Sequence, residues 1–454
     1  MDNPFDVALV AAKAFRASLA DRPPRPTIAP DELQARFDGP TPERGEAGAA
    51  VIEALAHAAE PGLMATPGSR FFGWIIGASH EVGVAADWLT SAWGQNAGLY
   101  VSAPAAATAE KIAGRWLLDI LDLPAESSVG FVTGATMANF VCLAAARSAV
   151  LERVGWDVEA NGLCGAPRVR ILMGAEAHAT VFAALRFLGF GSASARLIPT
   201  DAEGRMDAGA LEAALDEGEG PTIVIAQAGQ MNTGAFDPFP AIAQACWRHG
   251  AWLHVDGAFG LWARTVGELA PLVRDMDLAD SWAADGHKWL QLPYDSGFAI
   301  VRDPNAHRRA MTVAASYLPQ AEYEPAHYTP ELSRRARGFA AWAMIRHLGR
   351  QGIADMVRGH CLLARRLAMR LSAEPGIEVL NEVSLNQVVV AFGDDEATRA
   401  VIARLQQDNA CFAGGGLWRD RWVLRLPIIA APLTERDIDR LALAIISAWR
   451  AVRT

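Results

Sequence analysis

The chain has 454 residues, of which 51% are hydrophobic and 20% charged, and its formal net charge is −10. This length exceeds what one hydrophobic core supports, so two or three domains are expected. The negative charge argues against nucleic acid and anionic membranes as partners, and no apolar run is long enough for a membrane span. The five cysteines form no C-x-x-C pair, which favours free thiols packed in the core and a cytoplasmic location.

Residues 1–80 are expected to form a helical arm. Apolar residues at helical spacing predict helices over 7–19 and 45–57, and proline-rich connections separate them. Because this arm lacks enough apolar residues for a core of its own, we expect it to pack on another domain or another subunit. After an aromatic segment at 70–77, a buried helix is predicted over 82–93 and an amphipathic one over 105–121.

Strands and helices then alternate. Strands are predicted over 129–132, 168–173, 222–227 and 252–255, and the helices between them over 137–150, 179–188 and 239–249. This alternation indicates a mainly parallel α/β sheet covered on both faces. We expect a large domain over 81–336, followed by a smaller α/β domain over 337–454 with strands at 387–392 and 422–426.

Ligands of parallel α/β sheets bind at the carboxyl ends of the strands, where three features stand out. Thr133-Gly134-Ala135-Thr136 separates a strand from a helix, as in an anion site or an ordinary threonine helix cap. His178 follows another strand, and it could either face a ligand or have a purely structural role. Asp256 ends an apolar strand, where a carboxylate needs a cation or several donors. A metal ion bound by His254 and Asp256 is a further possibility, but no other ligands for it are evident.

Lys288 lies in Trp282-Ala-Ala-Asp-Gly-His-Lys-Trp-Leu290, an apolar setting that lysine usually avoids. An ordinary loop lysine that reaches solvent is one interpretation. In an apolar pocket, however, the pKa of the amine would fall and the lysine could form a Schiff base. Pyridoxal phosphate needs such a lysine, a phosphate cradle, a flat partner over its ring and a carboxylate at its ring nitrogen. The features after successive strands fit this one ligand together.

The motifs His-Val-Asp256-Gly-Ala258-Phe and His287-Lys288-Trp resemble the group II pyridoxal-phosphate-dependent decarboxylases from about Arg70 onward. The resemblance implies fold type I, with a seven-stranded large domain, and an obligate homodimer with a shared active site. It makes Lys288 the Schiff-base lysine and Asp256 the partner of the ring nitrogen. The other cofactor-binding positions that it implies are Ala258 beneath the ring, His178 above it, Ala135 and Thr136 at the phosphate, His287, and Asp285, where the family often has asparagine.

The resemblance also implies residues that act on the substrate. Tyr317 matches the loop tyrosine that protonates the α-carbon after decarboxylation, whereas aldehyde-forming relatives tend to have phenylalanine there. Arg425 matches an arginine that grips the substrate carboxylate in some members, although the following Leu-Pro-Ile-Ile departs from the family pattern. The side-chain pocket would be mostly apolar, lined by Phe71, Phe72, Trp74, Ile75 and, from the partner subunit, Leu99 and Tyr100.

The expected reaction is therefore decarboxylation of an aromatic or large apolar L-amino acid to its amine. Gln230 and Met231 replace threonines that many relatives have, which bears on the substrate rather than on the cofactor. Three alternatives stay open. They are another pyridoxal-phosphate reaction on this fold (aldehyde synthesis, transamination or carbon–carbon cleavage), a non-catalytic protein that binds the cofactor, and a nicotinamide dehydrogenase, for which the chain lacks a proper glycine fingerprint.

Overall fold

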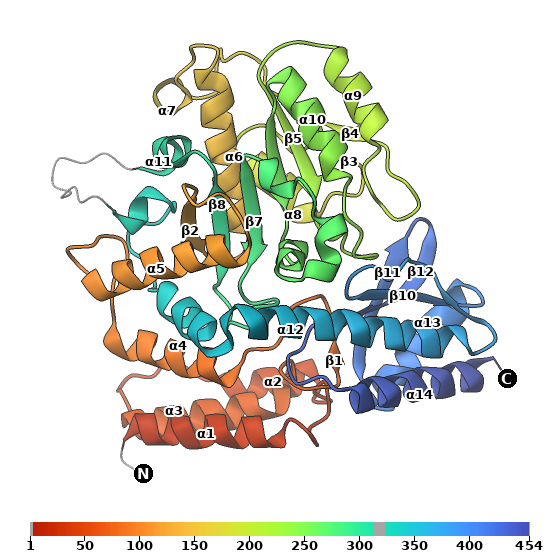
Figure 1. Ribbon diagram of the computed structural model, residues 1–454. Helices are drawn as coiled ribbons and strands as arrows, with labels where there is room; N and C mark the ends of the chain where they lie inside the picture. Colours follow the sequence, from red (N-terminus) through yellow and green to blue (C-terminus); the bar gives the residue numbers. More distant parts are fainter. Residues whose placement is uncertain (1–2, 313–322, 454) are drawn as a thin grey trace. The chain divides into compact units, whose positions relative to one another are not determined.

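The computed structural model describes residues 3–312 and 323–453, which form two compact units. Unit 1 comprises Met1–Ile75, Arg366–Val379 and Val389–Thr454, and unit 2 comprises Ile76–Arg365 and Leu380–Val388. Figure 1 labels their helices and strands. Within the described ranges, no helix is both long and apolar enough to cross a membrane.

Unit 2 is built on a seven-stranded sheet of order β2-β8-β7-β6-β5-β3-β4 (Figure 1). Strand β8 runs antiparallel to its neighbours β2 and β7, and the other pairings are parallel. The predicted mainly parallel seven-stranded sheet is confirmed. The strands are β2 (Ser128–Val132), β3 (Arg170–Gly174), β4 (Ala195–Ile198), β5 (Thr222–Gln227), β6 (Trp252–Asp256), β7 (Ser281–Asp285) and β8 (Gly297–Val301).

Helices cover both faces of this sheet. Helix α6 packs across β5 to β8 with α8 and α11 beside it, and α10 packs on β5 and β6 with α9 beside it. Ile223 and Ile225 join the core cluster that contains α6, whereas Val224 points to the opposite face because side chains alternate along a strand. The helices of this unit are α4 (Glu81–Trp93), α5 (Pro104–Ile120), α6 (Ala135–Glu152), α7 (Val158–Asn161), α8 (Ala179–Phe187), α9 (Ala208–Asp216), α10 (Phe239–His249) and α11 (Pro304–Met311).

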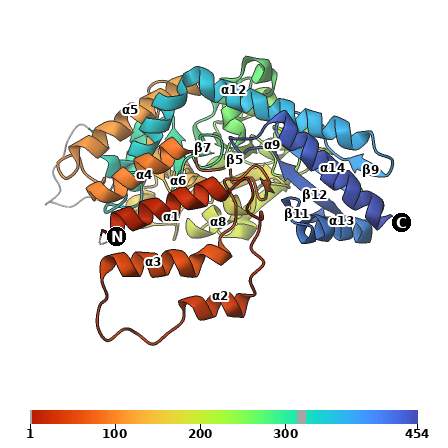
Figure 2. The same cartoon turned by 90° about the horizontal axis from the view of Figure 1, so that it is seen from below.

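A five-stranded sheet of order β1-β11-β12-β10-β9 belongs to unit 1. The first two residues of β10 are the exception, because they belong to unit 2. Helices α1 and α3 lie side by side in the same unit (Figure 2). Helix α12 (Gly338–Ser372) runs from unit 2 into unit 1 and is broken at Gly349, whose φ is 62°. The other elements of unit 1 are α1 (Pro4–Ser18), α2 (Pro30–Phe37), α3 (Gly48–Ala59), β1 (Phe71–Phe72), β9 (Ile377–Val379), β10 (Gln387–Phe392), α13 (Asp395–Gln407), β11 (Phe412–Trp418), β12 (Arg421–Pro427) and α14 (Glu435–Val452).

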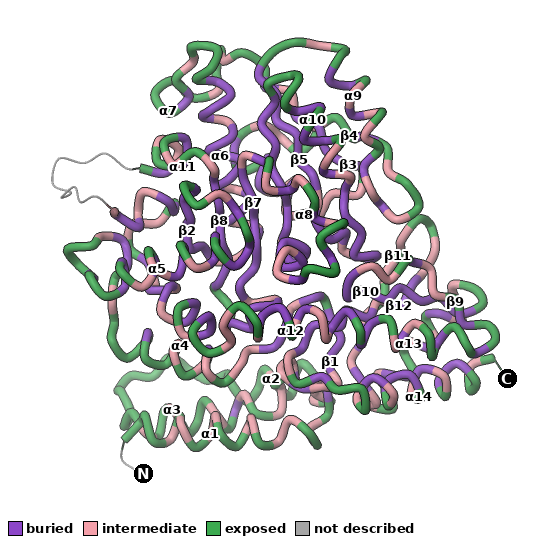
Figure 3. The backbone as a smooth tube through the Cα atoms, viewed as in Figure 1, coloured by how far each residue is buried: buried purple, intermediate pink, exposed green. Residues whose placement is uncertain are grey.

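The burial pattern corrects two expectations. The helix predicted over 82–93 forms as α4, but its expected burial is wrong, because Trp88, Leu89 and Trp93 are exposed. Cys164 is also exposed, whereas the other four cysteines are buried as expected. Figure 3 places the buried backbone mainly along the strands of the seven-stranded sheet and the exposed backbone along α1 to α3.

Candidate active site

Several strands of the seven-stranded sheet have their carboxyl ends on the same side of the sheet. This side is called the carboxyl edge, or simply the sheet edge, below. Asp256 is the last residue of β6 and Asp285 the last of β7, and the register pairs Gln227 with Asp256. Strand β2 runs in the same direction as β7, since both are antiparallel to β8, so Gly134 follows β2 at this edge. The sequence did not predict β7, because alanines and a terminal aspartate give a weak strand signal. Its position makes Asp285 a strand-end residue like Asp256.

Lys288 lies in the turn that follows β7. Its Nζ is 2.9 Å from Oδ2 of Asp285 and 5.6 Å from the centre of the Phe259 ring. The side chain of Lys288 is 16% exposed and that of Asp285 is 4% exposed. The expectation of an apolar pocket is therefore only partly confirmed. An aromatic ring lies near the amine of Lys288, but the carboxylate of Asp285 pairs with this amine.

Gln291 holds this turn in place. It is fully buried, has a left-handed φ of 54°, and donates from Nε2 to the Lys288 carbonyl at 2.8 Å. Its Oε1 accepts from the Ala78 N–H at 3.0 Å. Next to Ala78, a Cβ on Gly77 would stand 2.4 Å from the His287 carbonyl oxygen, so only glycine allows this approach. The sequence analysis missed Gln291, whose signal is a polar residue inside the apolar run Trp289-Leu-Gln-Leu.

Asp256 is a buried carboxylate, 4% exposed. Burial raises the pKa of its carboxyl above the usual range, and the positive charges of His178 and Lys288 oppose this shift. Its Oδ1 accepts from the Ala258 N–H at 3.3 Å. A buried carboxylate at a strand end, with cationic neighbours, is suited to bind a protonated ring nitrogen. The electrostatic interaction also places Lys288, His178 and Asp256 in one site.

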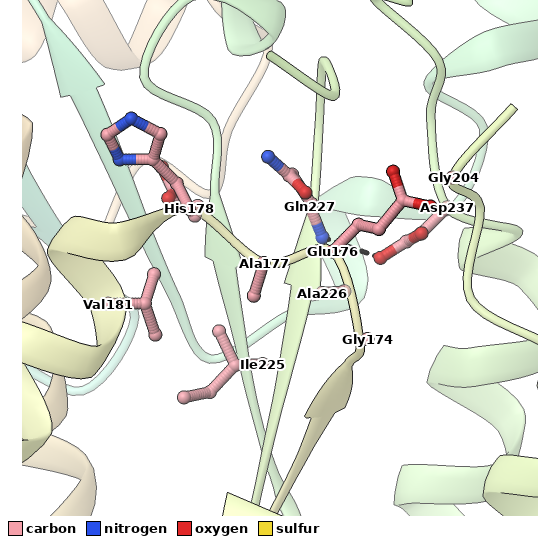
Figure 4. A pocket seen from close by; sticks show the side chains of 11 residues that line it. Gly174, Glu176, Ala177, His178, Val181, Gly204, Ile225, Ala226, Gln227 and Asp237 are labelled. Atoms are coloured by element: carbon pink, nitrogen blue, oxygen red, sulfur yellow. Dashed lines mark hydrogen bonds between the residues drawn. The ribbon is translucent and has the colours of Figure 1, made fainter. Parts of the chain in front are cut away.

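His178 has two roles in the structure. It caps helix α8, where its Nδ1 accepts from the Thr180 N–H at 3.3 Å and lies 2.7 Å from the Thr180 hydroxyl oxygen. It also lines a pocket at the ends of β3, β5 and β6, together with Gln227, Asp256 and other residues. In Figure 4, His178 and Gln227 project from adjacent chain segments, and Glu176 lies near Asp237 farther along the pocket. The capping role therefore does not remove His178 from the site.

The residues of the predicted phosphate cradle lie at the start of helix α6. Gly134 precedes the helix, and Ala135 and Thr136 are its first two residues. A Cβ on Gly297 of β8 would stand 2.5 Å from Gly134 Cα, so strand β8 holds the start of α6 closely. The Ala135 N–H donates to Oδ1 of Asp285 at 2.6 Å. Asp285 thus links the cradle to Lys288.

His287 also borders Asp285. Its Nδ1 donates to the Ser296 carbonyl at 3.1 Å and lies 3.6 Å from Oδ1 of Asp285. Burial lowers the pKa of His287, and the negative charge of Asp285 partly offsets this effect. The histidine is therefore favoured in its neutral form, with the Nδ1 proton directed to the backbone.

The alternative of a metal site at His254 and Asp256 is not supported by their contacts. His254 Nε2 lies 2.8 Å from Oδ1 of Asn139, and its Nδ1 lies 2.9 Å from the Ser281 hydroxyl oxygen. Both ring nitrogens are thus used in the protein core. Among residues 3–312 and 323–453, no group of three or more His, Cys, Asp or Glu is arranged to hold a metal ion.

The remaining predicted positions stay predictions. Tyr317 lies outside the described residues. Arg425, on β12, belongs to unit 1, as do the predicted pocket residues Phe72, Trp74 and Ile75, whereas Leu99 and Tyr100 belong to unit 2 with Lys288. Phe72 and Ile75 are buried, and Trp74 and Tyr100 are exposed.

The residues at the sheet edge fit pyridoxal phosphate. Lys288 offers an amine for its aldehyde, and the buried Asp256 offers a carboxylate for its ring nitrogen. The start of α6 offers backbone N–H groups for a phosphate, and Ala258 is small enough to leave room for a flat ring.

The comparison with protein families agrees with this site. The model of the pyridoxal-dependent decarboxylase conserved domain matches residues 30–392. The chain therefore belongs to the pyridoxal-dependent decarboxylase family, whose cofactor is pyridoxal phosphate, and by family it is a carboxy-lyase.

Individual relatives cover nearly the whole chain. The chain is 26% identical to tryptophan decarboxylase 1 of Oryza sativa subsp. japonica, over 97% of this chain and 90% of that protein. It is 24% identical to 4-hydroxyphenylacetaldehyde synthase of Rhodiola rosea, over 99% of this chain and 96% of that protein. The crystal structure of Oryza sativa TDC with PLP and tryptamine matches with a TM-score of 0.92 at 24% identity, over 99% of this chain and 98% of that one. This structural match shows the fold.

Proposed function

We propose that the protein decarboxylates an L-amino acid with an aromatic or large apolar side chain, releasing the amine and carbon dioxide. The observation that carries the proposal is that Lys288 and the buried carboxylate Asp256 lie in the same part of the sheet, close enough for the charge of Lys288 to act on Asp256. The family match supports decarboxylation, and the similarity to a tryptophan decarboxylase supports an aromatic substrate.

The chain's own residues have distinct roles in this reaction. Bound pyridoxal phosphate supplies the electron sink that accepts the electrons of the broken carbon–carbon bond. Lys288 would hold the cofactor through its amine. Asp256 would keep the ring nitrogen of the cofactor protonated, and Ala258 and His178 would help to hold its ring. Tyr317 delivers the proton that replaces the lost carboxylate.

The substrate pocket is proposed to be apolar. Phe72, Trp74 and Ile75 supply one wall, and Leu99 and Tyr100 of a second copy supply another. An apolar wall disfavours a second carboxylate on the substrate because that charge would lose its hydration. Arg425 is proposed to bind the α-carboxylate. Burial lowers the pKa of its guanidinium.

A homodimer with a shared active site belongs to the same proposal. Large apolar side chains are exposed on α1 and α3 of unit 1 and on α4 of unit 2 in the single chain, and exposed apolar side chains in number are typical of interfaces. They are Phe5, Val10, Val51, Leu55, Trp88, Leu89 and Trp93. The five free cysteines support a reducing, cytoplasmic location.

A second candidate is aldehyde synthesis, which the similarity to 4-hydroxyphenylacetaldehyde synthase favours. Carbon dioxide, amine and aldehyde should be quantified together for a panel of L-amino acids, with wild-type protein and Tyr317→Phe. We expect amine and carbon dioxide in equal amounts from wild type, and a shift toward aldehyde in Tyr317→Phe. Aldehyde as the main wild-type product would establish the second candidate, and consumption of the amino acid without release of carbon dioxide would contradict decarboxylation.

A further inference from the structure

The inference concerns Asp285, the residue at which the chain departs from the asparagine often found in the family it resembles. Its Oδ1 accepts the N–H of Ala135, the first residue of α6, at 2.6 Å. Its Oδ2 lies 2.9 Å from Lys288 Nζ. The carboxylate thus occupies the place where the helix N-terminus would meet an anionic ligand.

The difference between aspartate and asparagine is chemical rather than steric. An asparagine at 285 could accept the Ala135 N–H with its carbonyl oxygen and still donate from its amide to a phosphate oxygen. A carboxylate has only acceptor atoms, so it offers no hydrogen bond to a phosphate and adds a negative charge beside it. Like charges a few ångströms apart in a partly buried site repel each other much more strongly than in water.

The charged and polar groups around Asp285 come from several elements. Lys288 follows it in the same turn with Nζ at 2.9 Å, and the neutral His287 lies with Nδ1 at 3.6 Å. The positive end of the α6 dipole faces Oδ1, and the negative charge of Asp285 acts on Asp256 and on Tyr294. In the cofactor-free chain, Lys288 and the helix terminus therefore compensate the carboxylate. A bound phosphate must share the helix terminus with it, and the aldehyde must take Lys288 away from it.

We propose that Asp285 competes with the cofactor phosphate for the N-terminus of α6, and that the protein consequently retains pyridoxal phosphate less tightly than it would with asparagine at this position. Asp285 then acts as a determinant of cofactor affinity. The proposal rests on phosphate binding at Ala135 and Thr136, and it is independent of which amino acid is the substrate and which reaction follows.

The test compares two ligands that differ only in the phosphate. Dissociation constants of pyridoxal phosphate and of pyridoxal are measured on cofactor-free protein, by the absorbance of the lysine-bound ligand, for wild type and Asp285→Asn. Asp285→Asn should tighten pyridoxal phosphate by at least about tenfold and change pyridoxal far less. An equal change for both ligands would mean that Asp285 acts through Lys288 alone, and this outcome overturns the proposal. Weaker binding of pyridoxal phosphate would overturn it as well.

Two further variants keep the test decisive. Asp285→Ser keeps an acceptor for the start of α6 but removes the charge, so it should shift pyridoxal phosphate binding in the same direction if Asp285→Asn does not fold. Thr136→Val tests the cradle itself and should weaken pyridoxal phosphate but not pyridoxal. If Thr136→Val acts in this way and the Asp285 variants do not, the cradle stands and the role of Asp285 fails. If none of these variants distinguishes the two ligands, the phosphate does not bind at α6 and the proposal fails together with the cradle.

Discussion

The carboxyl edge of the seven-stranded sheet and the N-terminal helices α1 to α3 differ most in how deeply their side chains are buried. At the sheet edge, Asp256 and Asp285 are almost fully buried, and each has a defined donor or cation. Helices α1 and α2 bury no residue, and α3 buries only Ala58. The same polypeptide thus contains a region of fixed partners and a region whose apolar side chains are open to solvent.

This difference in burial predicts how strongly a substitution in each region affects the protein. Burial at the sheet edge makes each polar contact costly to lose, because an unpaired group there keeps its desolvation penalty. The exposed helices lose little when one side chain changes, unless a second protein body covers them. Substitutions in the two regions should therefore have effects of different size and kind.

The largest effect is expected from Lys288→Ala at the sheet edge. Without the amine, the cofactor cannot be held by its aldehyde, so the absorbance band of the lysine-bound cofactor should disappear and decarboxylation should fall to background. Absorbance spectra and carbon dioxide release measure both losses. Persistence of the band in this variant would assign the covalent link to another residue.

Asp256→Asn should lower decarboxylation by about 10²- to 10³-fold, the usual cost of one preorganised electrostatic partner. The amide cannot stabilise a protonated ring nitrogen as a carboxylate does. Asp280→Asn is the matched control, since Asp280 precedes β7 at the opposite edge of the sheet and accepts the Leu253 N–H at 2.8 Å. Equal losses in kcat for the two variants would show a general effect of carboxylates near the sheet.

Leu143→Ala, in the fully buried part of α6, should lower the free energy of unfolding by about 2–5 kcal/mol. The removed methyl groups leave a cavity between α6 and the sheet. Leu443→Ala on the exposed face of α14 should change it by no more than about 0.5 kcal/mol. Denaturant unfolding of both variants measures the contrast, and similar values would mean that burial within the chain does not decide the loss.

His307→Gln should reduce the acid sensitivity of the sheet region. His307 is buried, with Nδ1 2.8 Å from the Ser128 hydroxyl oxygen and Nε2 3.1 Å from the Tyr328 carbonyl oxygen, and burial lowers its pKa to about 3. Only the unfolded chain takes up this proton as the pH falls from about 6.5 to about 3, so stability is lost across that window. The slope should flatten by up to about 1.4 kcal/mol per pH unit. Unfolding of wild type and variant at several pH values measures it, and equal slopes would contradict this role of His307.

The smallest effect on the single chain, and the sharpest test of the comparison, is expected from Leu55→Glu. If α3 lies in a homodimer interface, a charge there should shift the protein toward monomer while the circular dichroism spectrum stays the same. Sedimentation at several protein concentrations measures the shift. A wild-type protein that sediments as a monomer throughout would contradict the proposed dimer.

Part of the site could be predicted from the sequence because its signals are local. Asp256 ends a mostly apolar strand, and Lys288 lies between a histidine and a tryptophan, so residue type and position along the chain were enough. Gln291 was missed because its role depends on a backbone turn and on Ala78, which is far away in the sequence. Strand β7 was missed because its two alanines and terminal aspartate carry little strand signal, whereas Phe298, Ile300 and Val301 gave β8 a usable strand signal.

The sequence by itself determined the alternation of strands and helices, the mainly parallel sheet and the residues that follow its strands, since these depend on side-chain periodicity and on chain order. Only the tertiary structure decided that Asp285 pairs with Lys288 and accepts the first N–H of α6. It also decided that α4 exposes its tryptophans. Burial and ion pairing depend on which distant segments of the chain become neighbours in the fold. They cannot be inferred from the type of any single residue.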